Sequence, residues 1–335
     1  MKNYCYILLI AVLSLFTLPS RAEEKEAFNV SELIFEHLGD SYEWHIAKSC
    51  VIHLPCILIE NGKVTTFMSS ELENGKECKG YHLAVDGDYA GKIVNAQGKR
   101  PFDISITKNV LQLFIVCFVL LAVFLGLAHW YKKNGFKKAP GGFVGAMEVI
   151  VNFVDKDVIK DSIGYGYQRF SGYLLTIFFF ILTCNLLGLI PVFPGGANLT
   201  GNIAVPMTLA ISAFIAINFF APKGYYKEIF WPEVPLFLKA IPLMPTIEFI
   251  GIFTKPFSLT IRLFANILAG HVIILSLSSL VFITAEMGQG INASMTFVGV
   301  AFSIFMNCLE LLVAFIQAYV FTMLTATFIG MAQSE

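Results

Sequence analysis

One stretch of sequence decides the fold: Phe257-Ser258-Leu259-Thr260-Ile261-Arg262-Leu263-Phe264-Ala265-Asn266-Ile267-Leu268-Ala269-Gly270-His271. Arg262 lies in this apolar run with no acidic residue within twelve positions on either side. A guanidinium at the centre of an apolar helix costs about 2.5 to 3.5 kcal/mol on membrane-insertion scales, and it does not lose its proton. We therefore expect Arg262 to have a functional role.

The composition predicts a multi-span membrane protein. The chain has 335 residues, of which 56% are hydrophobic and 14% charged, and this is too apolar for one soluble core. The net charge is -1, and most ionisable groups precede Lys108 or lie in short loops, so we expect no binding of nucleic acid.

Residues 1–22 have the features of a secretory signal peptide. Lys2 precedes an apolar run at residues 7–18, and Ser20-Arg21-Ala22 supplies small residues for a signal peptidase. We expect cleavage after Ala22, with an uncleaved anchor as the alternative. The mature amino terminus would then lie outside the cytoplasm.

Residues 23–107 are polar and predict a small external (periplasmic) domain that contains β-strands. Residues 52–59 and 64–68 flank Asn61-Gly62, a hairpin signal, and residues 92–94 fit a further strand. Three cysteines in this segment allow one disulfide and one free thiol, or no disulfide: Cys50, Cys56 and Cys78. The spacing of its histidines favours surface positions over a metal site, and we expect no cofactor.

Residues 108–335 form the predicted membrane domain, an all-α multi-span unit. Residues 109–131 match one span, and the lysines that follow it place that end in the cytoplasm. Apolar residues recur at helical spacing in residues 142–163 among charged ones, which indicates an amphipathic helix on the membrane surface. Two further ordinary spans are expected at 172–193 and 203–221.

The last two apolar segments are too long to cross a membrane upright. Residues 244–282 and 292–331 would extend about 58 to 60 Å as helices, whereas the hydrocarbon core is about 30 Å thick. The short turn near residues 286–290 makes them an antiparallel hairpin. We expect this hairpin to be steeply tilted, with a possible kink at Pro256.

The polar residues of this hairpin fall on defined helical faces. Glu248, Lys255 and Arg262 follow one another at seven-residue steps, and Asn266 lies about 40° further round the helix. Small residues share that side and allow close approach of another helix: Ser258, Ala265 and Ala269. His271 projects from roughly the opposite face.

On the second long helix, Glu310 and Gln317 are seven residues apart on one face. Polar groups of both helices would thus line an aqueous path. Structural alternatives remain open: an Arg262–Glu310 pair, a structural His271–Glu310 pair, and Gln317 as a helix-to-helix contact. Glu248 fits a surface carboxylate and a pathway group equally well.

These residues resemble subunit a of the F-type ATP synthase, the membrane stator of a proton-driven rotor. The segment from Ser258 to His271 is similar to the arginine helix of the family, and residues 316–321 are similar to its glutamine helix. The resemblance implies that Arg262 is the essential arginine. It implies proton-path roles for Asn266, His271, Glu310 and Gln317.

The resemblance also implies partners: a ring of c subunits, the subunit b peripheral stalk, the catalytic sector, membrane lipid and protons. It implies two proton half-channels that Arg262 separates, with Glu248 near the cytoplasmic exit, and an inner-membrane location with a cytoplasmic carboxyl terminus. Ser258, Ala265 and Ala269 would face the rotor. The chain contains no Gly-x-x-x-x-Gly-Lys-Ser/Thr phosphate loop, so we expect it to be no enzyme by itself.

Two features depart from the family pattern. In some family members the acid comes first in the sequence and the imidazole second, whereas here His271 precedes Glu310. The resemblance also gives no role to the long segment expected to be external. An ion-coupled membrane permease is the alternative function, although the two halves of the chain do not resemble each other. A membrane-anchored external binding module would leave Arg262 unexplained. The sequence leaves open proton or sodium coupling and the ring stoichiometry.

Overall fold

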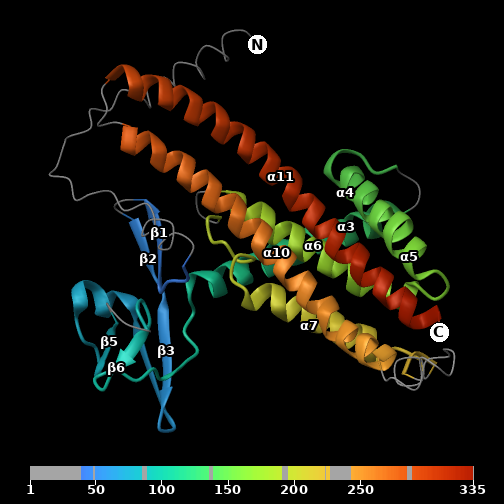
Figure 1. Cartoon of the computed structure of the whole chain (residues 1–335), viewed down its shortest axis with the longest axis horizontal. Helices are drawn as coiled ribbons and strands as arrows, with labels where there is room; N and C mark the ends of the chain where they lie inside the picture. Colours follow the sequence, from blue (N-terminus) through green and yellow to red (C-terminus); the bar gives the residue numbers. More distant parts are fainter. Residues whose placement is uncertain are drawn as a thin grey trace.

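The computed structural model describes residues 39–47, 50–84, 89–135, 139–190, 195–222, 224–226, 243–284 and 289–334. A β-containing part precedes Lys108, and a helical part follows it. Figure 1 shows the strands on one side of a helical bundle, whose two longest helices run side by side. Element labels follow Figure 1.

The β-containing part is built from three small antiparallel sheets. The strands are β1 (Glu43–Ala47), β2 (Cys50–His53), β3 (Pro55–Glu60), β4 (Lys63–Met68), β5 (Tyr81–Leu83), β6 (Ile93–Asn95) and β7 (Phe102–Asp103), with a 3-10 helix, η1, at Ser69–Gly75. β1 pairs with β2, β5 pairs with β6, and β3 lies between β4 and β7. The β3–β4 turn uses Asn61 at φ 50° and Gly62 at φ 78°, values that Asn and Gly tolerate in two-residue hairpins.

Alternation along β3 gives this part its own core. Cys56 and Leu58 are fully buried and pack with Phe67 of β4, as expected for side chains that point to one face of a sheet. Cys56 and Cys78 are free thiols, whereas the side chain of Cys50 lies outside the described residues. Two contacts tie this part to the first long helix: the Lys108 amide donates to the Ser41 carbonyl (2.9 Å), and the Asn109 amide donates to Asp40 Oδ1 (3.2 Å).

Four helices in the described part are long and apolar enough to cross a membrane. They are α3 (Lys108–Asn134), α6 (Gln168–Leu189), α10 (Leu243–Thr284) and α11 (Gln289–Ser334). Thr107 caps the amino terminus of α3 by accepting from the Val110 amide, and Gly135 ends that helix with φ 56°. The chain is thus a mostly helical multi-pass membrane protein.

Two segments differ in detail from the expected spans. α6 begins at Gln168 and ends at Leu189, four residues earlier at each end than the span expected at 172–193. α7 (Ala204–Phe219) has 16 residues, too few to cross about 30 Å upright. The loop before α7 is an inward-packed segment, because Ala197 and Leu199 are buried.

Residues 142–163 form one continuous helical segment beside the bundle. It consists of α4 (Gly142–Asn152), a π-helical stretch, η3 (Phe153–Lys160), and α5 (Asp161–Ile163). Val154, Val158 and Ile159 of η3 are buried against the bundle, and Ser171 of α6 donates a hydrogen bond to Asp155. α11 approaches this segment so closely that a Cβ at Gly330 would lie 2.2 Å from the Ser162 carbonyl oxygen.

α10 and α11 are the framework of the site. They have 42 and 46 residues, which correspond to about 63 and 69 Å of helix. α10 continues through Pro256 without a break. α11 also packs against α6, and α10 against α7, so the shorter helices support one half of the long pair (Figure 1). Buried apolar residues of α6, α10 and α11 share one core, including Phe178, Leu263 and Phe321.

Candidate functional site

α10 presents two different faces around Arg262. Leu259, Leu263 and Ile267 are buried against the bundle, as residues spaced three or four apart on one helical face should be. Arg262 and its neighbours are exposed on the other side: Ser258, Ala265, Asn266 and Ala269. Among the described residues Arg262 has no ion pair or hydrogen bond. The protein thus presents a cation on a face formed by small side chains.

His271 and Glu310 meet between the two long helices. Nε2 of His271 lies 3.8 Å from Oε1 of Glu310, and the two side chains are 16% and 5% exposed. His271 projects from the side of α10 opposite Arg262, because nine residues correspond to two and a half turns. The partner of Glu310 is therefore the imidazole, and the Arg262–Glu310 pair considered from the sequence does not form.

Gly270 makes room for the Glu310 carboxyl group. A Cβ at Gly270 would lie 2.7 Å from Oε1 of Glu310 and 3.1 Å from its Cδ. Both distances are shorter than a normal van der Waals contact, so the Glu310 carboxyl group takes this position against α10 only because residue 270 has no side chain. The carboxyl group is enclosed by backbone on one side and the imidazole on the other.

Gln317 lies two turns beyond Glu310 on the same buried face of α11 and is 5% exposed. No hydrogen bond within the described part of the chain joins it to Arg262. Asn185 of α6 reaches α11 between Glu310 and Gln317, where its Nδ2 donates to the Ala314 carbonyl (3.3 Å). The buried acid and amide are thus approached by a third helix.

Further buried polar residues, which the sequence pattern did not indicate, lie in α3, α6 and the loop before α7. Thr200 donates to Oδ1 of Asn185 (3.0 Å), and Gln112, Asn185, Asn198 and Thr200 are all buried. The available signal was an amide side chain inside an apolar span, as at Gln112 and Asn185, because a buried amide without a partner costs about 1–3 kcal/mol.

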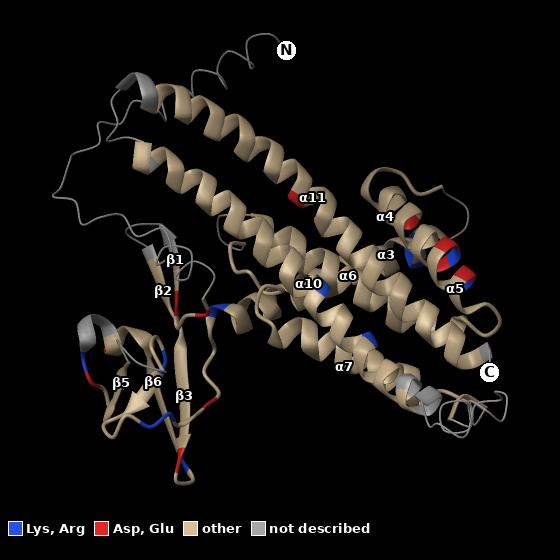
Figure 2. Cartoon of the chain, in the orientation of Figure 1, with Lys and Arg blue, Asp and Glu red and all other residues tan. Residues whose placement is uncertain are grey.

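Charge is sparse along the hairpin. The charged residues of α10 and α11 are Glu248, Lys255, Arg262 and Glu310, and Figure 2 shows how few coloured positions interrupt the two long helices. Lys255 lies with Nζ 5.1 Å from the centre of the Phe328 ring, a cation–π contact with α11. The side chain of Glu248 lies outside the described residues, so its expected role is not addressed by the structure.

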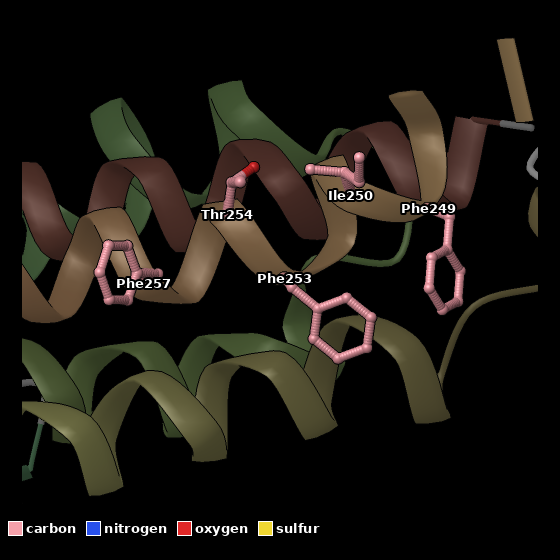
Figure 3. Close-up of a pocket in the computed structure, with 5 residues that line it drawn as sticks. All are labelled: Phe249, Ile250, Phe253, Thr254 and Phe257. Carbon is pink, nitrogen blue, oxygen red and sulfur yellow. The ribbon is translucent and has the colours of Figure 1, made fainter. Parts of the chain in front are cut away.

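A shallow apolar hollow of about 290 Å³ lies elsewhere on α10. Its lining is Phe249, Ile250, Phe253, Thr254 and Phe257, and Figure 3 shows Phe253 projecting toward a neighbouring helix, in agreement with its stacking on Phe214 of α7. The hollow contains no ionisable group and lies on a different side of α10 from Arg262.

The fold and the site define a multi-pass membrane protein that encloses an acid and an imidazole within a long helix pair and presents a cation outside it. A family model described as ATP synthase A chain matches residues 110–330. The chain belongs to this family, that of subunit a of the F-type ATP synthase. A second model, a domain of unknown function (DUF8433), matches residues 33–111.

Individual relatives agree with this assignment. The chain is 46% identical over 236 residues to ATP synthase subunit a of Chloroherpeton thalassium, covering 69% of this chain and 67% of the relative. It is 48% identical over 240 residues to that of Chlorobium phaeobacteroides (70% and 67%) and 40% identical over 237 residues to that of Myxococcus xanthus (69% and 73%). The chain is therefore a component of the membrane sector of an ATP synthase.

Proposed function

We propose that this stator subunit couples the passage of protons across the membrane to rotation of a ring of partner subunits, each with one carboxyl group. The observation that supports this proposal is that two opposite faces of α10 present different functional groups. The exposed face has Arg262 among small residues, and the enclosed face has the His271–Glu310 pair. Rotation and proton delivery thus use opposite sides of one helix.

The ring would move past the exposed face. Ser258, Ala265 and Ala269 are small and exposed, so a neighbouring helix can approach the backbone closely there. A carboxyl group that faces lipid is favoured in its neutral form, whereas a cation at about 4 Å favours the ionised form by about 4 kcal/mol at an effective dielectric of 20. Arg262 would therefore promote loss of the proton as each ring carboxyl passes.

The enclosed residues would deliver protons to the ring. Nε2 of His271 and Oε1 of Glu310 are 3.8 Å apart, longer than a hydrogen bond, so a proton would pass between them after a small side-chain movement or through one water molecule. Asn266 and Gln317 would continue the outer path, and Glu248 would assist release on the cytoplasmic side. Arg262 separates the two half-channels because its fixed positive charge repels a proton that would otherwise cross without turning the ring.

This assignment implies the rest of the assembly and its setting. The chain would contact the c-ring and the subunit b stalk in the cell inner membrane, with the mature amino terminus periplasmic and the carboxyl terminus cytoplasmic. Each proton that crosses 100 mV releases about 2.3 kcal/mol, so several must pass for each ATP made on the catalytic sector. The chain would take no part in the ATP chemistry itself.

The test is Arg262→Ala in the intact complex. ATP-driven acidification of inverted membrane vesicles should fall to background, while immunoblots show the normal amount of the chain in the complex. Arg169→Ala is the comparison, because that arginine stacks on Phe220 at 4.5 Å, away from the hairpin interior, and should keep coupled pumping. Coupled pumping by Arg262→Ala would refute the proposal.

A further inference from the structure

One face of the sheet formed by β4, β3 and β7 is apolar and exposed. Cys56 and Leu58 of β3 enter the core on one side of the sheet, so their neighbours in the strand point to the other side. Strand pairing adds residues of β4 and β7 to this second side. We call it the uncovered face, and its apolar residues are Ile57, Ile59, Val64, Met68, Phe102 and Ile104.

The largest side chains of the uncovered face are more than half exposed. Phe102 is 69% exposed, Val64 63% and Ile104 51%. The core of the β-containing part lies on the opposite side of the same sheet, where Tyr81 of β5 and Ile93 of β6 pack. A contiguous apolar patch on a folded surface marks a site of contact with a protein or a membrane.

The uncovered face lies close to the point where α3 begins. The Ile104 and Ile106 amides donate to carbonyl oxygens of β3 (2.9 and 3.1 Å), so the chain stays attached to the sheet almost to Thr107, the cap of α3. Ile104 is four positions before the first residue of α3, a reach of at most about 14 Å. Figure 1 shows β5 and β6 on one side of β3 and the helical bundle on the other. The face turned away from β5 and β6 is therefore on the membrane side of the sheet.

Exposed cations border this face. Lys63 opens β4, Lys99 and Arg100 come just before β7, and all three are exposed. The acids of the same strands are engaged by hydrogen bonds, because Glu60 accepts from a tyrosine and an asparagine and Asp103 accepts from a second tyrosine. Anionic lipid headgroups attract Lys and Arg near a membrane surface. Cations beside exposed apolar side chains are the pattern of segments that lie in the interface.

We propose that the uncovered face docks on the membrane surface at the end where α3 enters it. Its apolar side chains would lie among the lipid headgroups, and its bordering cations would contact anionic phosphate groups. A lipid partner is favoured over a protein because the face ends beside a helix that continues its apolar surface, with Phe114 and Phe118 exposed on α3. The inference goes beyond the proposed function and does not depend on it.

Photo-crosslinking in the intact complex tests the docking. Phe102 would be replaced by p-benzoylphenylalanine, and the complex would be reconstituted in vesicles of phosphatidylcholine and phosphatidylglycerol. After irradiation, mass spectrometry should detect phospholipid attached to the peptide that contains position 102. The matched control has the same probe in place of Tyr89, which is also exposed but lies in the connection between β5 and β6, across the core from the uncovered face.

Phospholipid adducts at position 102 and not at position 89 support the docking. Adducts to another protein subunit at position 102 would overturn it, because the occupant would then be a protein. The absence of any adduct at 102, or equal lipid adducts at both positions, would overturn it as well.

The bordering cations have a separate test with the probe at position 102. Lys99→Gln combined with Arg100→Gln should lower the yield of phospholipid adduct about tenfold in vesicles that contain phosphatidylglycerol, because two charges that attract the anionic surface are removed. The yield should already be low in vesicles of phosphatidylcholine alone. Lys76→Gln is the comparison, since Lys76 is exposed but follows η1, away from β4 and β7, and should leave the yield unchanged. Equal yields in the two kinds of vesicle would overturn the contact with anionic headgroups.

Discussion

Gly270 and Glu310 are in direct contact at the centre of the helix pair, where a Cβ on Gly270 would lie 2.7 Å from the Glu310 carboxyl oxygen. The glycine therefore determines how deeply the acid enters the interface between α10 and α11. It also precedes His271, the partner of that acid. The position of the acid and its pairing with the imidazole thus depend on the same turn of α10.

Gly270→Ala should disturb this arrangement. Overfilling a packed interior costs about 1–3 kcal/mol, and the movable group here is the buried Glu310 side chain. We expect ATP-driven proton pumping to fall about tenfold or more, measured in inverted vesicles with normal amounts of chain. Gly251→Ala is the matched control, because a Cβ on Gly251 meets nothing within 4 Å. Equal activity of the two variants would show that this contact is unimportant for transport.

Exchanging His271 and Glu310 should restore part of the proton pumping that each single substitution removes. His271→Glu alone places two acids together and Glu310→His alone places two imidazoles together, whereas the double variant again has one acid and one imidazole at the two positions, whose side chains lie 3.8 Å apart in this structure. We expect the double variant to pump about tenfold faster than either single variant, a coupling of about 1.4 kcal/mol. If the effects of the two changes simply add, the side chains do not act as one relay.

Asn185→Leu should destabilise the bundle. The change removes the donor to Ala314 and leaves the buried Thr200 hydroxyl without its acceptor, at a cost of about 1–3 kcal/mol. A lower unfolding temperature of the detergent-solubilised complex would report it. Asn218→Leu is the comparison, since that amide donates only to Phe214 of its own helix. If Asn185→Leu lowers the unfolding temperature no more than Asn218→Leu does, the hydrogen bonds of Asn185 to Ala314 and Thr200 do not stabilise the bundle.

The β-containing part of the chain should lose stability in acid through Glu60. Hydrogen bonds from the Tyr81 hydroxyl and the Asn95 amide lower the pKa of the half-buried Glu60 carboxyl group. Because the folded-state pKa is depressed, the stabilisation is fully present above the unfolded value of about 4.3 and is lost as the pH falls through the folded value. Acid thus weakens the link from β3 to β5 and β6.

The fluorescence of Trp44, which is 3% exposed, should report this unfolding once Trp130 and Trp231 are replaced by phenylalanine. Glu60→Gln should remove the loss between about pH 5 and pH 3. Glu77→Gln, at an exposed carboxyl group of the same part, should leave it intact. The same acid profile for Glu60→Gln and the unchanged chain would exclude this mechanism.

Much of the molecule could be predicted from single residues and their spacing along one helix. A charged residue in an apolar run is visible without a structure because its cost depends on the side chain and the membrane alone. Helical periodicity likewise predicts that Arg262 and His271 lie on opposite faces of one helix, since nine residues correspond to two and a half turns. The family and the multi-pass architecture followed from such features; the comparisons confirmed the family, and the four long apolar helices support the multi-pass architecture.

Other features required the tertiary structure. The sequence left two partners open for Glu310, Arg262 and His271, and the packing of the helices selected His271, beside a glycine that leaves space for the carboxyl group. Asn185 contacts Ala314 across 129 positions of sequence. No periodicity within one helix determines such a contact, because it depends on how α6 packs against α11. The sequence by itself determined which residues are costly in a membrane, and only the packing of helices decided which of them meet.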